Sequence, residues 1–594
     1  MLHVICRYTV ISLNVVIKVI PTIVYKEKEL KISKVHLEGF RNFSNSIINF
    51  NRNTLIIGAN DVGKSNLLHA LRILLDKSLS EADIEPNELD FHINSNGVSD
   101  EISITVEFSD ITEDAVISVL KGSVSEDNET FLRYTAERSS LSYKLFIGPS
   151  VDNFQEINSR FYLKHMHLKY IESQRDLEKF IRKEKRQLLK IAQESLSEDE
   201  RQEDDDLLGE ISSDLENLND KVSQLVYVDK ATNDVNDELK KLAHHYANYK
   251  VQLDTGAIQV NDFIEKLQLG ANSNGSNVML GGDGRNNQIL LALWKAKSAQ
   301  EHDLENEVIF YVIEEPEAHL HPHQQRKLAT YLIDELPGQT IISSHSPQIT
   351  VNFSPDSIIR LVHQCSSTVA ASEGCSCCIE SGWEDMSYRM SILPAEAFFS
   401  DGIFLVEGPS EMLFYQSLSK ALGIDLDFEN LSILSVDGIS FKVFISILDA
   451  LQIPWTMRTD NDISKIPGKN EWQHAGINRC LSLLGKDPFD RSYAEFSSQD
   501  TVDNGDWQTA SDMLNDKGIF LSKVDLETDL VEELSDEVQT AVGKSDRDSA
   551  IRYLQGKKAL RMRMLLKSIS RDLHKLNNGE LAKPLHKLVE MRRT

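Results

Sequence analysis

The chain has 594 residues, with 63 basic and 92 acidic side chains and a formal net charge of −29. This length predicts roughly two to four domains. The negative charge argues against a protein that coats nucleic acid generally, although a local basic stripe would still allow DNA binding.

The first 29 residues do not have the pattern of the domain that follows. The stretch "VISLNVVIKVIPTIVY" is apolar, but it contains Asn14, Lys18 and Pro21 and is short for a membrane span. No small-residue cleavage site follows it. Because "LKISKVHLEGFRNF" is typical of the opening strand of a domain, we expect residues 1–29 to be an extension from an upstream start codon, without a membrane anchor.

A nucleotide-binding motif comes next. "NTLIIGANDVGKSNLLHALRILL" has the pattern strand, loop, helix, and Gly58 to Ser65 matches G-x-x-x-x-G-K-[ST]. Gly58 and Gly63, with Asn60 between them, let backbone N–H groups turn toward phosphate oxygens. Lys64 can reach the β- and γ-phosphates, and Ser65 can ligate Mg²⁺. The positive end of the following helix favours the same anion, so we expect ATP to bind here.

Two later strands complete this nucleotide site. In "EVIFYVIEEPEAHLHP" the apolar run Val308–Ile313 is typical of a parallel strand that is buried on both faces. It ends on Glu314, which can hold the Mg²⁺ shell, and Glu315, which can orient or deprotonate the attacking water. "TIISSHSPQI" predicts another buried strand, and His345 after it is placed to sense a γ-phosphate.

A glycine-rich turn lies before the strand that ends on Glu314. "VMLGGDGRNNQILLALWKAK" contains Gly281, Gly282 and Gly284 and resembles the ABC signature, whose loop caps ATP on the opposite subunit. A plain helix-capping turn is the alternative. Together the motifs resemble the ABC-type ATPase head shared by SMC, RecF and OLD proteins. The sequence "IEEPEAHLHP" resembles the corresponding segment of the OLD-like branch of these ATPases.

The long separation between these motifs predicts an insertion. From about residue 168 the pattern is helical and highly charged, with apolar residues three or four apart. They are Leu207, Leu208, Ile211, Leu215, Leu218, Val222 and Leu225. We expect an amphipathic arm that either dimerises protomers, which we favour, or packs back on the head. The acidic run "SEDERQEDDD" is expected to be a solvated loop.

Acidic residues follow two apolar runs in the C-terminal half. "IFLVEGPSEMLFY", "LSILSVDGISFKVFISILDAL" and "QIPWTMRTDNDI" alternate strand and helix, which predicts a small parallel sheet with ligands at the carboxyl ends of its strands. Glu407 and Asp460 fall at such ends, Asp462 shares a face with Asp460, and Glu411 lies in the first helical turn. These carboxylates would repel one another without cations, so we expect hard divalent ions between them.

This Glu…Asp-x-Asp arrangement resembles the Toprim domain of topoisomerases, primases and OLD nucleases. In "KGIFLSKVDLETDLVEEL", Glu527 and Asp529 match a further acidic element of OLD nucleases, which implies a second metal position. Two ions about 4 Å apart, Mg²⁺ or else Mn²⁺ or Ca²⁺, would activate a water and stabilise the leaving 3′-oxygen. Lys557 or Lys558 would steady the transition-state charge. Asp437 stands where the family uses the neighbouring glycine, so we assign it no metal.

The resemblance to the OLD (overcoming lysogenization defect) family runs from about residue 30 to the end, because two unrelated motif sets occur in the family order. It implies an α/β protein: an ABC-type P-loop ATPase head with a helical dimerisation insertion, then a Toprim domain. The expected segments are the extension 1–29, the first part of the head 30–167, the insertion 168–265, the second part of the head 266–392, and a Toprim nuclease domain 393–594 with basic C-terminal helices.

The resemblance also implies the function. We expect a nucleotide-regulated, divalent-metal-dependent DNA endonuclease in the cytoplasm, working as a homodimer or homotetramer in anti-phage defence. Some family members act alone, some with a UvrD-like helicase as in Gabija, and some beside a retron reverse transcriptase and its RNA–DNA hybrid. The alternative is a RecF/SMC-like DNA-binding ATPase in DNA repair without nuclease activity. A strand-passing or priming Toprim enzyme ranks last, since no segment obviously supplies a DNA-gate domain with a nucleophilic tyrosine.

Two further features leave alternatives open. The six cysteines do not form a disulfide framework and favour a reducing compartment, and "CSSTVAASEGCSCC" is either a zinc site without paired C-x₂-C knuckles or a plain loop. The last segment is basic and either faces phosphate or pairs with acidic residues of its own protein. Its basic residues are Arg552, Lys557, Lys558, Arg561, Arg563, Lys567, Arg571, Lys575, Lys583, Lys587, Arg592 and Arg593.

Overall fold

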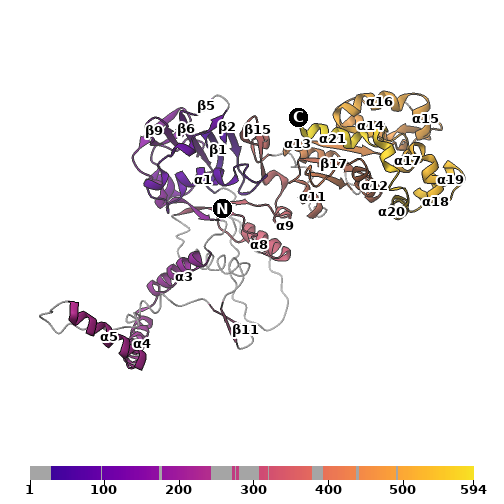
Figure 1. Cartoon of the computed structure of the whole chain (residues 1–594). Coiled ribbons are helices and arrows are strands. Elements are labelled where there is room, and N and C mark those ends of the chain that lie inside the picture. The colour runs from indigo at the N-terminus through magenta and orange to yellow at the C-terminus, as the bar shows by residue number, and fades with distance from the viewer. Residues whose placement is uncertain are drawn as a thin grey trace, which may run out of the picture.

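The computed structural model describes residues 29–94, 97–172, 177–242, 270–273, 276–279, 307–318, 320–376, 392–436, 441–489 and 492–593. The glycine turn that contains Gly281, Gly282 and Gly284 lies outside these residues, as do Asp437 and the extension before Glu29. Two α/β bodies lie side by side, and helices of the insertion extend away from the first body (Figure 1).

An antiparallel sheet forms one layer of the first body, the head. Its strand order is β2-β1-β6-β7-β8-β9. Inward-facing apolar side chains alternate with outward polar ones along β1, as expected for a sheet with one face on a core. The strands are β1 (Lys31–Phe40), β2 (Phe43–Asn49), β6 (Glu101–Ser109), β7 (Thr130–Glu137), β8 (Ser142–Ser150) and β9 (Asn153–Ile157), with a hairpin of β4 (Ile93–Asn94) and β5 (Gly97–Val98) and the helix α2 (Asp114–Val119) nearby.

The second sheet of the head carries the nucleotide motifs. Its order is β10-β13-β14-β3-β15-β16, and all neighbours are parallel except β15 and β16. Because β3, β13 and β14 run the same way, the segments that follow them meet at one edge. The elements are β3 (Asn53–Ile57), α1 (Lys64–Leu75), β10 (Met166–Ile171), β13 (Val308–Glu314), α8 (Pro322–Asp334), β14 (Thr340–Ser343), α9 (Pro347–Thr350), β15 (Ile358–Gln364) and β16 (Ser367–Ala370). The sheet includes β10 through Ile171, so the head extends past the expected boundary at residue 167.

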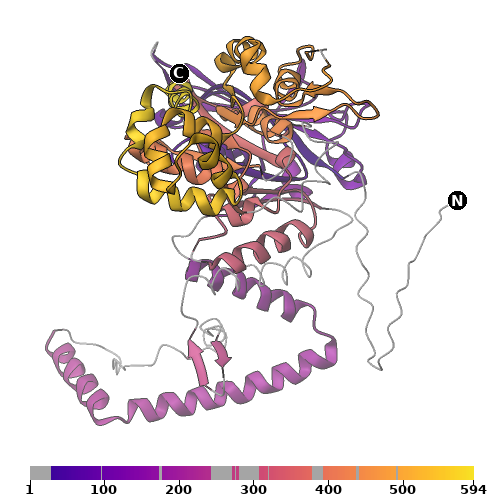
Figure 2. The same cartoon turned by 90° about the vertical axis from the view of Figure 1, so that its right-hand side faces the viewer.

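The insertion is helical where it is described, as α3 (Leu177–Glu194), α4 (Glu198–Ser223) and α5 (Val226–Leu242), with a hairpin of β11 (Gly270–Ser273) and β12 (Ser276–Met279). Figure 2 shows α4 and α5 far from both bodies, with α3 leading toward the head. The prediction that the acidic run is a loop was wrong: Ser197 caps α4 in a reciprocal pair with Glu200, and acids in the first turn favour the positive helix end. Leu207 and Leu218 on this arm are more than half exposed.

The second body contains a four-stranded parallel sheet of order β18-β17-β19-β22, as the alternating pattern predicts. Its strands are β17 (Gly402–Val406), β18 (Leu431–Ser435), β19 (Trp455–Thr459) and β22 (Ile519–Leu521), beside a hairpin of β20 (Ile463–Lys465) and β21 (Trp472–His474). Its helices are α11 (Ile392–Ala397), α12 (Pro409–Ala421), α13 (Phe441–Ala450), α14 (Ala475–Leu483), α15 (Ser498–Asp503), α16 (Asp506–Leu514), α17 (Leu526–Glu533), α18 (Ser535–Val542), α19 (Arg547–Gln555), α20 (Lys558–Ile569) and α21 (Lys583–Arg593).

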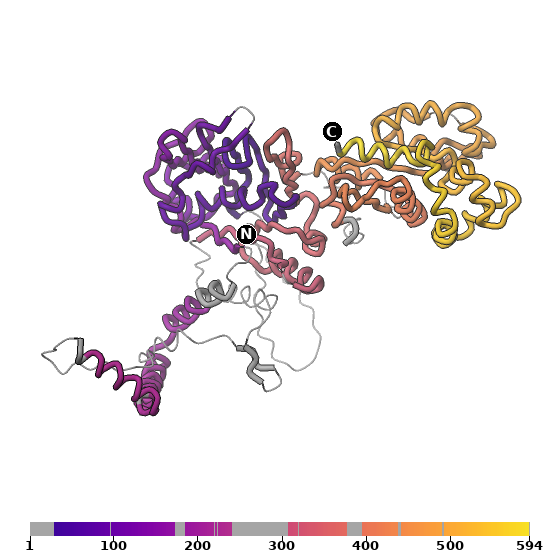
Figure 3. The backbone as a smooth tube through the Cα atoms, in the orientation of Figure 1, coloured from indigo at the N-terminus to yellow at the C-terminus, as the bar shows by residue number. Residues whose placement is uncertain are grey.

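The helix α21 covers the centre of this sheet. The tube in Figure 3 shows it lying along the strands of the second body. A Cβ added at Gly402 on β17 would meet Leu588 of α21 at 3.1 Å, so the two elements approach closely. The hydroxyl of Thr456 on β19 donates to Pro584 O at 3.3 Å, and Arg592 pairs with Glu429. The basic tail therefore pairs in part with acids of its own protein.

A buried arginine joins the two bodies. Arg360 lies on β15 opposite Ile57, the last residue of the strand that leads into the nucleotide loop. Its guanidinium donates to the carbonyl oxygens of Leu451 at 3.2 Å, Gln452 at 3.1 Å and Ser400 at 3.1 Å, all in the second body. One apolar core continues across the same seam.

Candidate nucleotide site and candidate metal centre

The loop between β3 and α1 depends on glycine. Gly58 and Gly63 have φ of 151° and 109°, where side chains are disfavoured. A Cβ at Gly63 would also lie 1.9 Å from Asn42 Nδ2, and that amide donates to Val62 O at 2.6 Å. The hydroxyl of Thr368 donates to the same carbonyl at 2.7 Å. No local motif indicated that Asn42 and Thr368 support the loop, because both come from distant segments.

The charged groups of the candidate nucleotide site lie close together. Lys64 Nζ donates to Gly58 O at 3.0 Å and Ala59 O at 2.8 Å, which holds the ammonium group over the loop. Burial lowers the pKa of Lys64, while Glu315 and Glu314 act in the opposite direction. Ser65 donates a hydrogen bond to Glu314, whose other oxygen accepts from Tyr170 at 2.5 Å. The hydroxyl and carboxylate expected around Mg²⁺ are therefore adjacent.

His345, which follows β14, lies at the same edge of the sheet. Its Nε2 lies 3.5 Å from Glu315 Oε1. Burial, followed by the charge of Lys64, lowers the pKa of His345, so the ring is neutral at neutral pH. Glu317 was not predicted: its Oε1 accepts from Ser344 Oγ and from His345 N, both at 2.7 Å, and fixes the segment that carries the histidine.

A cavity of about 760 Å³ opens between the nucleotide loop and the second body. Asn60, exposed on the loop, contributes to one wall. The other head residues are Gly58, Ala59, Asp61, Val62, His345 and Arg360 to Gln364, and the second body contributes Phe398, Phe399, Asp401, Asn430, Gln452 and Arg592. The nucleotide edge therefore faces the second body directly.

The carboxylates of the second body also gather at a strand edge. Glu407 follows β17 and Asp460 follows β19, and these strands are parallel neighbours. Glu407 Oε1 accepts from Asp460 N at 2.9 Å and from the hydroxyl of Thr459. Glu411 lies in the first turn of α12 and Glu527 in the first turn of α17. Glu407, Glu411 and Asp460 were expected to converge with Asp462, and Glu527 to supply a second metal position. The structure brings Glu407, Glu411, Asp460 and Glu527 to this edge.

One lysine bridges two of these acids. Lys558 Nζ lies 3.6 Å from Asp460 Oδ2 and 3.6 Å from Glu527 Oε2. Burial lowers the pKa of Lys558, but Glu527 and Asp460 outweigh burial and raise it, so the side chain stays charged. Lys557 is the exposed N-cap residue of α20. Of the two candidate lysines, the geometry favours Lys558.

The carboxylates of this cluster are removed from water without enough positive charge or hydrogen bonds to offset their burial. Burial and then Glu407 raise the pKa of Asp460 to about 8. Burial, with Glu527 as a repelling neighbour, raises the pKa of Glu411 to about 7. Glu527 accepts from Ser410 Oγ at 3.1 Å through Oε1, but its buried Oε2 has no hydrogen bond. Such a set of oxygens stabilises a bound cation.

Asp462 and Asp529 depart from the expected geometry. Asp460 faces Lys558 whereas Asp462 Oδ2 lies 3.2 Å from Arg479 Nη2, so the two aspartates do not point at one position. Asp529 forms a buried ion pair with Arg458 and accepts from Lys523 N at 3.2 Å. This structural contact does not support its expected place as a metal ligand. The spacing in sequence could not show it, because Arg458 comes from another strand.

Arg479 was missed by the sequence analysis. It lies on α14 and donates through Nη2 to Glu407 Oε1 at 3.0 Å and Asp460 O at 3.1 Å. The segment "AGINRCLSL" is an ordinary amphipathic helix, so no local signal indicated this contact. In the described part of the chain, no three His, Cys, Asp or Glu side chains have the spacing of a metal site in this conformation. Two basic side chains stand between the acids instead, while the oxygen-rich donor set fits a hard divalent ion.

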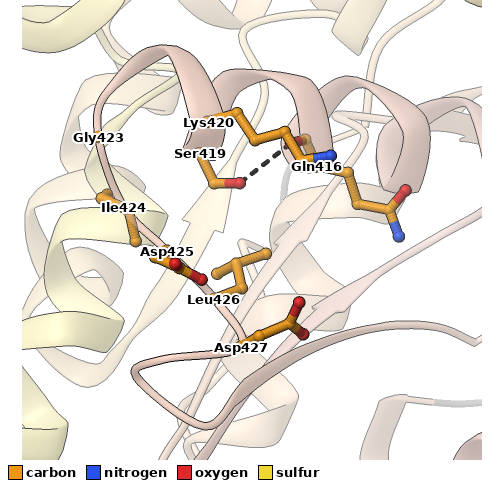
Figure 4. A pocket seen from close by; sticks show the side chains of 8 residues that line it. All are labelled: Gln416, Ser419, Lys420, Gly423, Ile424, Asp425, Leu426 and Asp427. Carbon is orange, nitrogen blue, oxygen red and sulfur yellow. Dashed lines mark hydrogen bonds between the residues drawn. The ribbon is translucent and has the colours of Figure 1, made fainter.

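A second cavity, of about 550 Å³, lies at the far end of α12 (Figure 4). It contains none of the acids discussed above. Its lining consists of Gln416, Ser419, Lys420, Gly423, Ile424, Asp425, Leu426 and Asp427. Ser419 donates to the backbone of Gln416 rather than into the opening.

Comparison with known proteins agrees with the two bodies. Residues 30–350 match the family model described as AAA ATPase domain, and the chain belongs to this family. Residues 398–462 match the model described as "Overcoming lysogenization defect protein-like, TOPRIM domain". These residues include Glu407, Glu411, Asp460 and Asp462.

The chain is also similar to individual proteins. It is 24% identical over 572 residues to "Endonuclease GajA" of Bacillus cereus (strain VD045), which covers 91% of this chain and 96% of that protein. An SMC head bound to the C-winged helix domain of ScpA is 17% identical, covering 57% of this chain and 96% of that one, with a TM-score of 0.37. The C-terminal region of the Burkholderia pseudomallei OLD protein is 21% identical, covering 33% of this chain and 99% of that one, with a TM-score of 0.22.

The family models and the GajA similarity confirm the expected resemblance and fold class, an ATPase head followed by an OLD-like TOPRIM domain. They also support the predicted enzyme class, an endonuclease with an ATPase domain. Of the helices that the structure describes, none has the length and apolar character needed to cross a membrane.

Proposed function

We propose that this protein is a divalent-metal-dependent DNA endonuclease that is regulated by ATP, or another nucleotide, at its head. The observation that carries the proposal is the cluster of buried and half-buried acids with Lys558 at the carboxyl edge of the TOPRIM sheet. The similarity to an endonuclease and the OLD-like TOPRIM match support the same activity. ATP is the proposed ligand of the head, and Mg²⁺, Mn²⁺ or Ca²⁺ that of the TOPRIM domain.

The roles follow from position. Glu407, Asp460, Glu411 and Glu527 would hold the metal, and Asp462 would contribute at the position that it now shares with Glu407 around Arg479. Divalent ions at such a site activate a water and neutralise charge on the leaving oxygen of a phosphodiester. Lys558 lies within 3.6 Å of two of these acids and is placed to stabilise negative charge that develops on the phosphate.

Regulation by nucleotide is supported by the seam between the two bodies. The loop that would bind phosphates is one strand away from Arg360, whose guanidinium holds the backbone just before β19, the strand that ends at Asp460. A change at the loop therefore has a short covalent and hydrogen-bonded route to the acids. Arg360→Gln should leave ATP binding intact and reduce the response of DNA cleavage to ATP. An unchanged response would argue against this route.

The exposed apolar side chains of α4 and α5 support a homodimer, or a homotetramer built from two dimers. The resemblance to phage-defence effectors supports a cytoplasmic role in anti-phage defence, either alone or beside a helicase or a retron reverse transcriptase with its RNA–DNA hybrid. DNA is the proposed substrate.

A supercoiled-plasmid assay tests the activity. Full-length protein with Mg²⁺ or Mn²⁺ should nick or linearise the plasmid, and Glu407→Gln should lower the rate by about a thousandfold or more, because the metal would lose a ligand. Circular dichroism should show the variant folded. If all DNA forms stay intact and Glu407→Gln behaves like the wild type, the RecF/SMC-like DNA-binding ATPase becomes the better assignment.

A further inference from the structure

The position of α14 is fixed against the acidic edge of the TOPRIM sheet. A Cβ at Gly476 would lie 2.7 Å from both Asp460 O and Asp462 N, so only glycine allows this approach. The Gly476 N–H donates to Asp462 O at 2.8 Å. One turn later the same helix carries Arg479. The fold therefore presents this arginine to the acids by a tight backbone contact rather than by a flexible loop.

The contacts of Arg479 converge on a single nitrogen. Its Nη2 lies 3.0 Å from Glu407 Oε1, 3.1 Å from Asp460 O and 3.2 Å from Asp462 Oδ2, and it also contacts the hydroxyl of Thr459. Four oxygens from the ends of β17 and β19 thus surround one positively charged group. An oxygen cage of this kind is what a hard divalent cation takes in proteins.

The remainder of the guanidinium is poorly matched to its place. Arg479 Nε is buried without a hydrogen bond, as is Arg458 Nε, although a satisfied guanidinium uses its donors in a planar fork. The side chain is nevertheless 38% exposed, whereas that of Arg458 in the pair with Asp529 is 4% exposed. Arg458 therefore lies in the core, whereas the side chain of Arg479 is partly open to solvent.

We propose that Arg479 is a displaceable counter-ion of the metal centre: it occupies the cation position between Glu407 and Asp462 until a divalent ion binds, and then turns outward to bind a DNA phosphate. The inference rests on the proposed metal-dependent nuclease and adds a residue to it. A planar guanidinium can grip phosphate oxygens in pairs, so the residue released by the metal serves the substrate. Arg479 is thus a phosphate-binding residue of the loaded enzyme.

Metal affinity provides the first test. Titration calorimetry of full-length protein with Mn²⁺ should show Arg479→Gln binding the ion on the order of fivefold more tightly than the wild type, because the ion no longer competes with the arginine. Arg479→Lys keeps the charge and should stay near the wild type. Arg552→Gln, on the exposed surface of α19, is the matched control and should change nothing.

DNA affinity provides the second test. With Mn²⁺ present, binding of a phosphorothioate duplex by Arg479→Gln should weaken, and the slope of log K against log salt should fall by about one phosphate contact. Without metal, wild type and variant should bind the duplex equally, because the arginine is then held by the acids.

The outcomes are separable. If the wild type binds no Mn²⁺, the proposed metal-dependent function fails. If it binds Mn²⁺ but Arg479→Gln binds it equally or more weakly, the function stands and the counter-ion role is overturned. Equal DNA binding by the metal-loaded proteins overturns the phosphate-binding role. A folded Arg479→Lys variant with wild-type metal affinity and reduced DNA affinity supports the inference even if Arg479→Gln is unstable.

Discussion

The two candidate sites solve the same problem in different ways. Both lie at the carboxyl edge of parallel strands, and both bring acids next to a lysine. In the head, the lysine is positioned by residues close to it in sequence, since Lys64 donates to the carbonyl of Gly58 from its own loop. In the TOPRIM domain, Lys558 reaches Asp460 from a helix far along the chain. Function in the first depends on a local motif, and function in the second depends on packing.

The largest expected effect separates the two C-terminal lysines. Lys558→Ala should reduce the rate of DNA cleavage by about a hundredfold to a thousandfold, because it removes a cation that lies 3.6 Å from both Asp460 and Glu527. Lys557→Ala, one residue away and exposed, is the control and should cleave nearly as fast as the wild type. Plasmid cleavage rates measure both, and equal losses would show that the lysines act only through local charge.

The next comparison separates a structural acid from a metal-binding one. Asp529→Ala should lower the free energy of unfolding by about 3–5 kcal/mol, because it leaves Arg458 charged and unpaired in the core. Glu527→Gln should retain stability in urea melts and lose cleavage instead. If Asp529→Ala is stable and inactive, Asp529 belongs with the metal ligands after all.

Changes at the head should spare the chemistry of the second body. Lys64→Ala should weaken ATP binding by about tenfold to a hundredfold, since the ammonium group would otherwise contact the phosphates. Its cleavage rate without nucleotide should equal that of the wild type, and ATP should no longer alter it. Fluorescent-nucleotide binding and plasmid cleavage provide the readouts, and Lys31→Ala, at the half-buried start of β1 where Lys31 pairs with Asp110, is the control for the loss of a lysine. Loss of nucleotide-free cleavage would contradict separate sites.

A smaller effect should come from the glycine beneath α14. Gly476→Ala should destabilise the protein by about 1–3 kcal/mol, because its methyl group would collide with backbone atoms of the segment that follows β19. The shift should also misplace Asp460 and slow cleavage by about tenfold. Gly485→Ala is a partial control: nothing surrounds that position, although its φ of 64° adds local strain. Wild-type cleavage in Gly476→Ala would show that α14 does not set the geometry of the acids.

The smallest effect concerns pH. The folded-state pKa of Asp460 is about 8 and that of Glu411 about 7, against ordinary values of 3.8 and 4.5. Between these limits the folded protein binds protons that the unfolded chain has lost, so the free energy of unfolding of metal-free protein should fall as pH rises from about 5 to about 8. Urea melts in EDTA measure this slope, and Asp460→Asn should flatten it. A slope of the opposite sign would mean that both acids are already compensated.

The difference between a local motif in the head and the packing of distant segments in the TOPRIM domain also decides how much of each site the sequence predicts. The nucleotide loop, Glu314 and His345 could be placed because strand ends in one parallel sheet must meet. Glu407 and Asp460 could be placed for the same reason. Arg479 and the partner of Asp529 could not, since their contacts depend on how α14 and β19 pack. The acidic start of α4 is helical rather than a loop because Ser197 and Glu200 cap it reciprocally, which its acidic composition alone does not indicate.

The order of elements along the chain has a consequence during synthesis. The ribosome makes β17 and β19, with Glu407 and Asp460, well before it makes α20 and α21. Until those helices emerge, the central strands lack the cover that Leu588 provides over Gly402, and Lys558 is absent from the acids. The acidic cluster with its lysine is therefore completed only among the last steps of the chain's synthesis.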